Sequence, residues 1–386
     1  MTKQWIDFAH NIKQLYGKEF VPLHEPTFNE KEVKYVTDCI ETGWVSSVGA
    51  YVTSFEEDLA KFVGVKRAVA VVNGTAALHI ALKAVGVQAG DEVLMPSLTF
   101  IATANAVSYL QAVPHFVDVN EETLGVDPVK LEQYLAKIGE VRGGEPYNKR
   151  TNRRIKALVP MHTFGHPCMM DELVAICEKY HIVLVEDAAE SLGSYYKGKH
   201  TGTFGKVSAM SFNGNKIMTT GGGGAILTDD EELANYMKHI TTTAKVPHQW
   251  DFVHDEIAYN YRMPNINAAL GCAQLEKLTT FIEQKRTLTD FYEKLVANIE
   301  GVRLMKEPVH TSSNYWLQTL VLDETYKRDE VLQLLNDEGV MSRPIWTPMH
   351  ELDMYKDCPK MDLSATDYLK ERLVNIPSTP VQLGDR

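Results

Sequence analysis

Short β-branched runs alternate with longer amphipathic stretches between about residues 65 and 230, and this alternation restricts the possible fold more than any other feature of the chain. Repeated strand–helix units of this kind form a mostly parallel sheet that is buried under helices. The intervening segments carry apolar residues at three- and four-residue spacing, as amphipathic helices do. The sequence therefore predicts a large α/β domain with a seven-stranded sheet. The expected strands are 68–72, 91–96, 114–119, 154–160, 181–187, 207–212 and 224–229.

The length of 386 residues is enough for two hydrophobic cores. We expect an N-terminal helical extension over residues 1–25, a large α/β domain over 26–275, and a smaller C-terminal α+β domain over 276–386. One long helical pattern, residues 266–300, is expected to bridge the two domains. The polar stretch 141–154 contains a Gly pair and a Pro, which predicts a surface loop with a solvated basic cluster.

Composition restricts the partners and the compartment. The chain carries 39 basic and 51 acidic residues, a net charge of −12, so it lacks the basic excess that nucleic acids and anionic membranes select for. We therefore expect neither as a partner. No apolar run approaches the roughly 20 residues of a membrane span, and charges interrupt the N-terminal region, so we expect a cytoplasmic protein. Five scattered cysteines are expected to be reduced thiols.

The first of three candidate functional motifs is NGTAAL, residues 73–78, between a predicted strand and a predicted helix. The backbone N–H groups and the positive end of the helix dipole at such a position can bind a phosphate. Gly74 permits close approach of the backbone, and Thr75 adds a hydroxyl group. An ordinary turn with a helix cap explains the same residues, so this motif alone does not decide between the two.

The second and third motifs follow buried strands. Asp187 in VEDAAES would lie at the sheet edge, where a carboxylate can bind a metal, cap a helix or pair with a cationic ring nitrogen. Lys216 in SFNGNKIMTTGGGG can act as a Schiff-base nucleophile, and the motif lacks the residue order of a P-loop. A phosphate site, an acid and a lysine together are what pyridoxal phosphate (PLP) requires.

Several longer motifs carry a resemblance to a known family. They are NGTAALHIAL, PSLTFIATANAVSYLQAVPHFVDV, MHTFGHP, VEDAAESLGSYYKGKHTGTFG, SFNGNKIMTTGGGGAILTDD and YNYRMPNINAALGCAQLE. From about residue 20 to the C-terminus, the chain resembles the nucleotide-sugar aminotransferases of the DegT/DnrJ type, which have fold type I of the PLP enzymes. WVSSVGAYVTSFEEDLAKF, TTTAKVPHQWDFVHDEIAYNYRMPN and RPIWTPMHELDMY are similar to the LegC-like branch, which makes precursors of legionaminic acid and bacillosamine.

The resemblance implies a role for each matching residue in binding PLP. Gly74, Thr75 and Ser211 would contact the phosphate, Phe100 would stack on the ring, Asp187 would pair with the ring nitrogen, Glu190 would lie next to the phenolic oxygen, Lys216 would form the Schiff base, and Asn260 would reach the phosphate of the neighbouring subunit. The role of Asn260 implies a homodimer with shared active sites.

Two residues depart from the family pattern. Relatives commonly have Gln or His where this chain has Glu190, and an acid where it has Gly222. Neither departure removes a covalent step. Relatives with His at the lysine position act as dehydratases, so Lys216 favours transamination.

The resemblance further implies L-glutamate as the amino donor and a UDP-linked 4-keto-6-deoxy-N-acetylhexosamine as the acceptor. A GDP-4-keto-6-deoxymannose aminotransferase and a non-catalytic PLP-binding regulator are the alternatives. A nicotinamide oxidoreductase would need Gly-x-Gly-x-x-Gly, which NGTAAL does not supply. Polar residues in loops are candidates for contacts with the sugar nucleotide; they are Trp44, Ser46, Ser47, His162, Lys245, His248, Arg262, Arg343 and His350.

Two further sets of residues are assigned to structural roles. His162 and His166 flank a Gly and have no acidic third ligand nearby, so we expect no metal site. Tyr259, Tyr261, Tyr315 and Trp316 are expected in the core between the domains rather than as a platform for the sugar.

Overall fold

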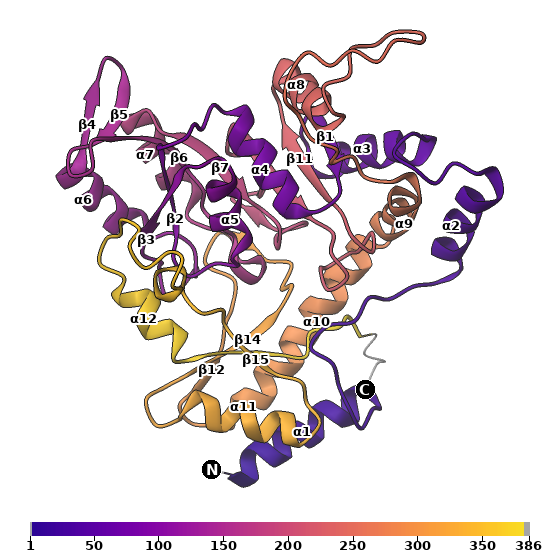
Figure 1. The fold of residues 1–386 in the computed structure, drawn as a ribbon. Helices are drawn as coiled ribbons and strands as arrows, with labels where there is room; N and C mark the ends of the chain where they lie inside the picture. The colour runs from indigo at the N-terminus through magenta and orange to yellow at the C-terminus, as the bar shows by residue number, and fades with distance from the viewer. Residues whose placement is uncertain (1, 382–386) are drawn as a thin grey trace.

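The computed structural model describes residues 2–381, and a large mixed sheet forms its centre (Figure 1). The main path of this sheet has the strand order β1-β11-β10-β7-β6-β2-β3. Only β11 on this path runs antiparallel to its neighbours β1 and β10. All seven predicted strands are present, and the predicted α/β fold class is confirmed. Their bounds are β1 (Arg67–Val71), β2 (Glu92–Pro96), β3 (Val113–Val117), β6 (Arg153–Leu158), β7 (Val183–Asp187), β10 (Val207–Ser211) and β11 (Gly224–Thr228).

Helices bury both faces of this sheet because successive strand residues point to opposite sides. In β2, Val93 and Met95 pack into the core under α4, α5 and α8, whereas Leu94 packs into the core under α6 and α7. A third core lies under α3 and α9. The helices that contribute to these cores are α3 (Ala50–Val63), α4 (Gly74–Ala84), α5 (Ala102–Tyr109), α6 (Pro128–Ile138), α7 (Met170–Tyr180), α8 (Glu231–Thr241) and α9 (Asn265–Leu275).

The predicted surface loop over residues 141–154 is wrong in part, because most of it forms strands. β4 (Gly139–Arg142) and β5 (Glu145–Asn148) make a hairpin, and β5 pairs with the start of β6. Gly143 and Gly144 form the two-residue turn with φ of +60° and +87°. A turn with two positive φ angles matches the twist of paired strands and favours glycine, so the Gly pair was a hairpin signal.

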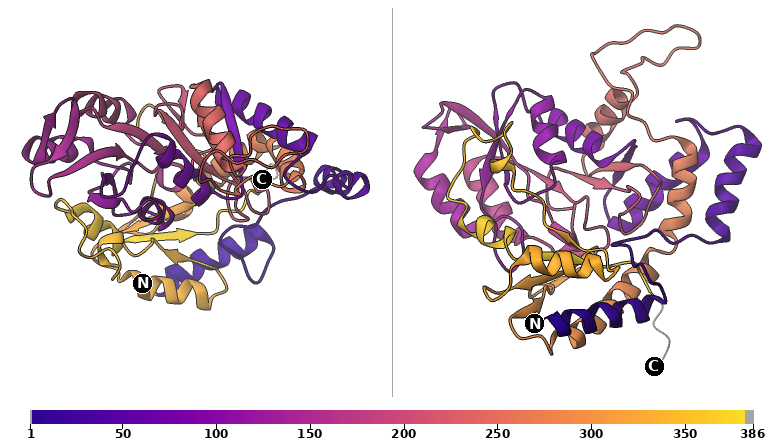
Figure 2. Two further views of the ribbon diagram at one scale, coloured as in Figure 1. Left: turned by 45° about the horizontal axis from the view of Figure 1, so that its top comes forward. Right: turned by 60° about the horizontal axis from the view of Figure 1, so that its bottom comes forward.

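The C-terminal part of the chain forms a smaller, four-stranded antiparallel sheet in the order β12-β14-β16-β15. The helix α1 packs on this part, where Trp5, Phe8 and Ile12 share a core with Leu288 and Val331. Figure 2 shows α1 beside α11. The elements are α1 (Thr2–Tyr16), α10 (Leu278–Val296), β12 (Val302–Leu304), β14 (Gln318–Leu322), α11 (Arg328–Asp337), β15 (Arg343–Pro344), α12 (Ser364–Lys370) and β16 (Leu373–Ile376).

The long helical pattern over residues 266–300 is divided in the structure. It forms α9 and α10, which meet at Glu276 and Lys277, so the prediction of one bridging helix was wrong. α10 extends from the large sheet to the smaller one (Figure 1). The remaining elements are α2 (Glu30–Thr42), the small sheet of β13 (Thr311–Ser312), β8 (Tyr195–Tyr196) and β9 (Lys199–His200), and the 3₁₀ turns Thr163–Gly165 and Met349–Glu351.

Within residues 2–381, no helix combines the length and the apolar character that a membrane crossing needs.

Candidate active site

The turn from β1 into α4 meets the end of β10. Gly74 is the first residue of α4, and the side chain of Asn73 accepts a hydrogen bond from the backbone N–H of Ala76 at 2.7 Å. A Cβ atom on Gly74 would lie 2.8 Å from Cβ of Ser211, so only glycine allows this close approach. Apart from the N–H of Ala76, which Asn73 already binds, the first backbone N–H groups of α4 have no partner within the helix. They lie with Thr75 and Ser211 where an anion can be bound.

Asp187 ends β7 and is 3% exposed. Its carboxylate accepts a hydrogen bond from the Thr103 hydroxyl at 2.7 Å and another from the backbone N–H of Ala189 at 3.2 Å. Burial raises the pKa of Asp187, and the two hydrogen bonds oppose that rise by favouring the charged form. A cation placed against this carboxylate would favour the ionised state further.

Lys216, which is half-buried, and buried Glu190 form an ion pair beside Asp187. Lys216 lies in the turn that follows β10, and its Nζ is 3.2 Å from the Glu190 carboxylate. The other carboxylate oxygen accepts a hydrogen bond from the backbone N–H of Phe164 at 2.9 Å. Burial raises the pKa of Glu190 to about 7, and nearby Asp187 adds to the rise. The departure from the family residue at this position therefore places a titrating acid against the lysine.

Aromatic side chains line one side of this pair. Phe100 is 48% exposed, and its ring centre lies 6.1 Å from that of Trp346. Trp346 in turn lies 5.2 Å from Phe164, and the ring of Trp316 lies 4.0 Å from Nζ of Lys216. Sequence reasoning did not assign Trp346 to the site, although the residue lies in the quoted motif RPIWTPMH.

The aromatic set that we expected between the domains is divided. Trp316 is buried in the core that joins the large sheet and the C-terminal part. Tyr259 and Tyr261 instead stack on each other at 5.0 Å and pack against His79 of α4, so their assignment to the domain interface was wrong. Tyr315 packs edge-on against His166.

Two predicted substrate residues are buried and already paired. His162 is 0% exposed; its Nε2 lies 3.1 Å from Glu186, and its Nδ1 accepts a hydrogen bond from the backbone N–H of Cys168. Arg262 is 8% exposed and donates to Glu56 at 3.3 Å. Both ring nitrogens of His162 are used, so the structure gives this residue a role in packing rather than in substrate contact.

The other predicted substrate residues lie on exposed segments in several places. Trp44 lines a cavity of about 520 Å³ with Tyr51 and Asn265, and Ser46 and Ser47 follow it in the link between α2 and α3. Lys245 and His248 belong to the long segment after α8, which projects from the molecule in Figure 1. Asn260, the residue predicted to reach the partner's phosphate, pairs with Thr242 at the base of this segment. Arg343 is exposed on β15, and the Ser97 hydroxyl oxygen lies 2.8 Å from Nδ1 of His350, within hydrogen-bond distance.

One group within residues 2–381 has the arrangement of metal ligands. His350, Glu351 and Asp367 offer ligand atoms within 4.8 Å of one another, and both acids are exposed. His162 and His166 are not part of that group. Exposed acidic groups of this kind are common in proteins without a metal, so our expectation that the protein has no metal site stays a prediction.

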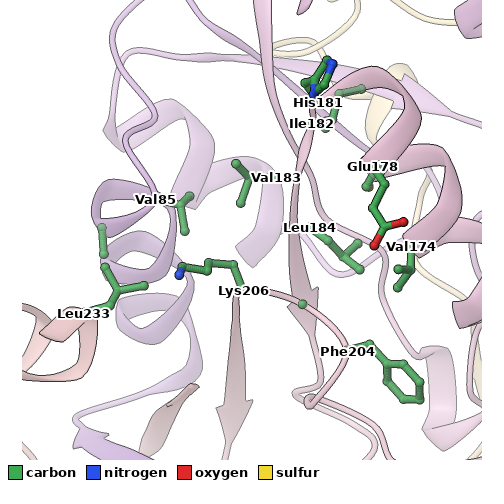
Figure 3. A pocket seen from close by; sticks show the side chains of 13 residues that line it. Val85, Val174, Glu178, His181, Ile182, Val183, Leu184, Phe204, Lys206 and Leu233 are labelled. Carbon is green, nitrogen blue, oxygen red and sulfur yellow. The ribbon is translucent and has the colours of Figure 1, made fainter. Parts of the chain in front are cut away.

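A surface cavity of about 850 Å³ lies near the opposite end of the parallel strands (Figure 3). Val183 and Leu184 at the start of β7 line it, together with Val85, Glu178 and Lys206. None of the predicted site residues is among its lining residues. Ligands of open α/β sheets bind at the carboxyl ends of the strands, and these ends carry Asp187 and Ser211.

The residues at the carboxyl ends fit PLP. The glycine cradle at Gly74 and the Ser211 hydroxyl would hold the phosphate, Asp187 would pair with the ring nitrogen, and Lys216 would form the covalent link. Gly222, where relatives have an acid, faces open space, since a Cβ there would meet no atom within 4 Å. The fit of PLP to these residues therefore does not depend on Gly222.

The chain is similar to known proteins over most of its length. The model of the DegT/DnrJ/EryC1/StrS aminotransferase family matches residues 26–385. The chain is 40% identical to EpsN of Bacillus subtilis (strain 168), over 86% of this chain and 83% of that protein. It is 38% identical to GDP-perosamine synthase of Escherichia coli O157:H7, over 94% of each chain. The crystal structure of the aminotransferase TlmJ from Streptoalloteichus hindustanus is similar with a TM-score of 0.83 and 27% identity, covering 92% of this chain and 93% of TlmJ.

Proposed function

Because this chain belongs to the DegT/DnrJ/EryC1/StrS aminotransferase family and is a PLP-dependent sugar aminotransferase, we propose that it transfers the amino group of L-glutamate to C4 of a UDP-linked 4-keto-6-deoxy-N-acetylhexosamine. The product is a UDP-4-amino-4,6-dideoxy sugar for surface glycans of the legionaminic acid or bacillosamine type. The observation that carries the proposal is the meeting of Lys216, Asp187 and Glu190 at the carboxyl ends of β7 and β10.

Each side chain has a task in this proposal. When bound, PLP supplies an electron sink for the negative charge that forms at Cα of the amino donor. Asp187, held by Thr103 and Ala189, keeps the ring nitrogen protonated. Lys216 would act first as the base that takes the proton from Cα of the amino donor and then as the acid that gives this proton back.

Glu190 supports the proton transfer by Lys216. Its carboxyl group lies 3.2 Å from Nζ, and burial raises its pKa to about 7. An acid with a pKa near the working pH can take a proton from a neighbouring ammonium and give it back. This places a proton reservoir beside the residue that must act as a base and then as an acid.

Different observations support each of the two candidate nucleotides of the acceptor sugar, UDP and GDP. The motifs at residues 44–62, 241–265 and 343–355 resemble the LegC-like branch, which favours the UDP-linked acceptor. Relatives named GDP-perosamine synthase, 35–38% identical over 93–95% of this chain, favour GDP-4-keto-6-deoxymannose as the second candidate.

The test is to incubate the purified protein with L-glutamate and either keto-sugar nucleotide and to follow 2-oxoglutarate. Turnover of the UDP-linked sugar supports the proposal, whereas turnover of only the GDP-linked sugar replaces it with the second candidate. A yellow protein that turns over neither sugar indicates the non-catalytic PLP-binding regulator. A control without any sugar nucleotide measures the release of 2-oxoglutarate in the first half-reaction alone.

We propose that the active form is a homodimer in which Asn260 reaches the phosphate site of the partner subunit. Asn260 is exposed, and the segment that carries it also exposes Trp250, Phe252 and Ile257, which are 69%, 76% and 88% exposed. A contiguous set of exposed large apolar side chains marks a protein–protein contact.

The five cysteines support a place for the reaction in the cytoplasm. All five are free thiols, and four of them are buried. Unpaired cysteines are typical of a reducing compartment, because oxidising compartments favour disulfides.

A further inference from the structure

Four residues of the C-terminal part, Ser313–Trp316, cross from that part onto the large sheet just before β14; we call them the strap. Tyr315 within the strap has φ of +48°, a left-handed conformation that is uncommon for a bulky residue. Such a conformation persists only where the surrounding contacts hold it, and it is concentrated at functional sites.

The strap is bonded to the segment that carries Glu190. The side-chain N–H groups of Asn314 donate to the backbone oxygens of Glu190 and Leu192, both at 2.9 Å. The Ser313 hydroxyl donates to the backbone oxygen of Gly165 at 2.9 Å. Residues of the C-terminal part therefore hold the backbone of Glu190 in place.

The same strap is bonded to the turn that carries Lys216. The indole Nε1–H of Trp316 donates to the backbone oxygen of Asn215 at 2.7 Å. The face of the same indole lies 4.0 Å from Nζ of Lys216, a distance at which a ring attracts an ammonium group. Trp316 is 3% exposed, and buried Lys285 donates to its backbone oxygen at 2.9 Å, so the indole has little freedom to move.

We propose that Trp316 is a positioning residue that holds the Lys216 amine in place for its reaction with the cofactor aldehyde. Its N–H group fixes the turn before the lysine, and its ring face fixes the direction of Nζ toward Glu190. This inference rests on the proposed function, because it takes Lys216 as the residue that links to PLP.

The test compares the full-length wild-type protein with Trp316→Phe and Trp316→Leu, each freed of cofactor and then mixed with PLP or with pyridoxamine phosphate. The rate of PLP capture, followed by the visible absorption band, depends on where the Lys216 amine lies. The affinity for pyridoxamine phosphate does not, because this form of the cofactor has an amine in place of the aldehyde and forms no bond to the lysine. Trp5→Phe is the matched control, since Trp5 is also a buried tryptophan and its Nε1 has no hydrogen-bond partner within residues 2–381.

We expect Trp316→Phe to capture PLP about fivefold more slowly, from the loss of one hydrogen bond, and Trp316→Leu about tenfold to thirtyfold more slowly, from the loss of the ring face as well. Affinity for pyridoxamine phosphate should stay within about twofold in both variants and in Trp5→Phe. Capture at the wild-type rate by both Trp316 variants would overturn the inference. So would a parallel loss of affinity for pyridoxamine phosphate, because that result indicates general damage to the pocket. A wild-type protein that binds pyridoxamine phosphate but captures no PLP would instead contradict the assignment of Lys216.

Discussion

The cofactor side and the substrate side of the site differ in how much of each a single chain provides. Asp187 and Glu190 are each 3% exposed, and both find their partners within the chain. By contrast, the substrate candidates Trp44 and His248 lie on exposed segments, and so does Asn260, which we propose to serve the cofactor of the partner subunit. Buried polar groups must be paired inside the fold, whereas residues that meet a ligand or a second subunit can stay exposed until it binds. We therefore expect one chain to hold the catalytic residues, and the exposed residues to become covered only when substrate or a second subunit binds.

The strongest test of the cofactor side is Lys216→Ala. We expect a colourless protein whose turnover falls by at least about a thousandfold, because the covalent link and the proton carrier are both lost. Borohydride should fix the cofactor on Lys216 of the wild-type protein, as peptide mass spectrometry can show. Lys179→Ala is the control, since Lys179 is exposed and paired with Glu132. A colourless Lys216→Ala protein with wild-type turnover would refute the mechanism.

The neighbours Asp187 and Glu186 allow a sharper test, because adjacent strand residues point to opposite faces. Asp187→Asn keeps the shape but removes the charge, so we expect turnover to fall by about a hundredfold while the melting temperature changes little. Glu186 accepts backbone N–H groups from Gly202, Phe204 and Gly205. Glu186→Gln should therefore lower the melting temperature while the visible band of the bound cofactor is retained. A loss of melting temperature in Asp187→Asn together with a loss of the bound cofactor in Glu186→Gln would contradict both assignments.

The proposed sharing of sites between subunits is tested by mixing two inactive variants. If Asn260 serves the partner, a dimer of one Lys216→Ala chain and one Asn260→Ala chain has one intact site. Random mixing makes half of the dimers mixed, so activity should return to about a quarter of the wild-type value. The matched control is Lys216→Ala mixed with Asp187→Asn, which should stay inactive because both residues belong to one chain. Equal failure of both mixtures would show that the sites are not shared.

A milder test of the same surface is Ile257→Asp. Ile257 is 88% exposed, so the substitution should leave the fold of the subunit intact. A charge buried in a contact between subunits is costly, and we expect the dimer to dissociate at concentrations at which the wild-type protein stays paired. Sedimentation velocity measures this shift. Identical sedimentation of the two proteins would exclude the segment around Ile257 from the contact.

The sequence predicted the seven strands because parallel strands buried on both faces leave continuous apolar runs. It also pointed to Asp187, a carboxylate at the end of such a run, and to Lys216, a single lysine among small residues in the turn after another run. It did not assign Trp346 to the site or reveal the contact of Trp316 with Lys216, because these residues approach from the C-terminal part and only the folded chain brings them close. Polar type alone could not separate His162, which is fully paired, from residues that stay open to a ligand.

The smallest expected effect concerns the pH dependence of stability and tests whether Glu190 titrates as the burial implies. Burial raises its pKa to about 7 in the folded chain, from the ordinary glutamate value of 4.5. The folded state therefore keeps a proton that the unfolded chain releases, so stability falls as the pH rises from about 4.5 to about 7. The side chain in Glu190→Gln has no ionisable group, so the stability of this variant should not show this part of the decrease with pH. We expect the melting temperature of the wild-type protein to drop by a few degrees relative to Glu190→Gln across that range, whereas exposed Glu132→Gln should follow the wild-type curve. Parallel curves for wild-type and Glu190→Gln would mean that Glu190 stays ionised beside Lys216, and the proton reservoir would have to be abandoned.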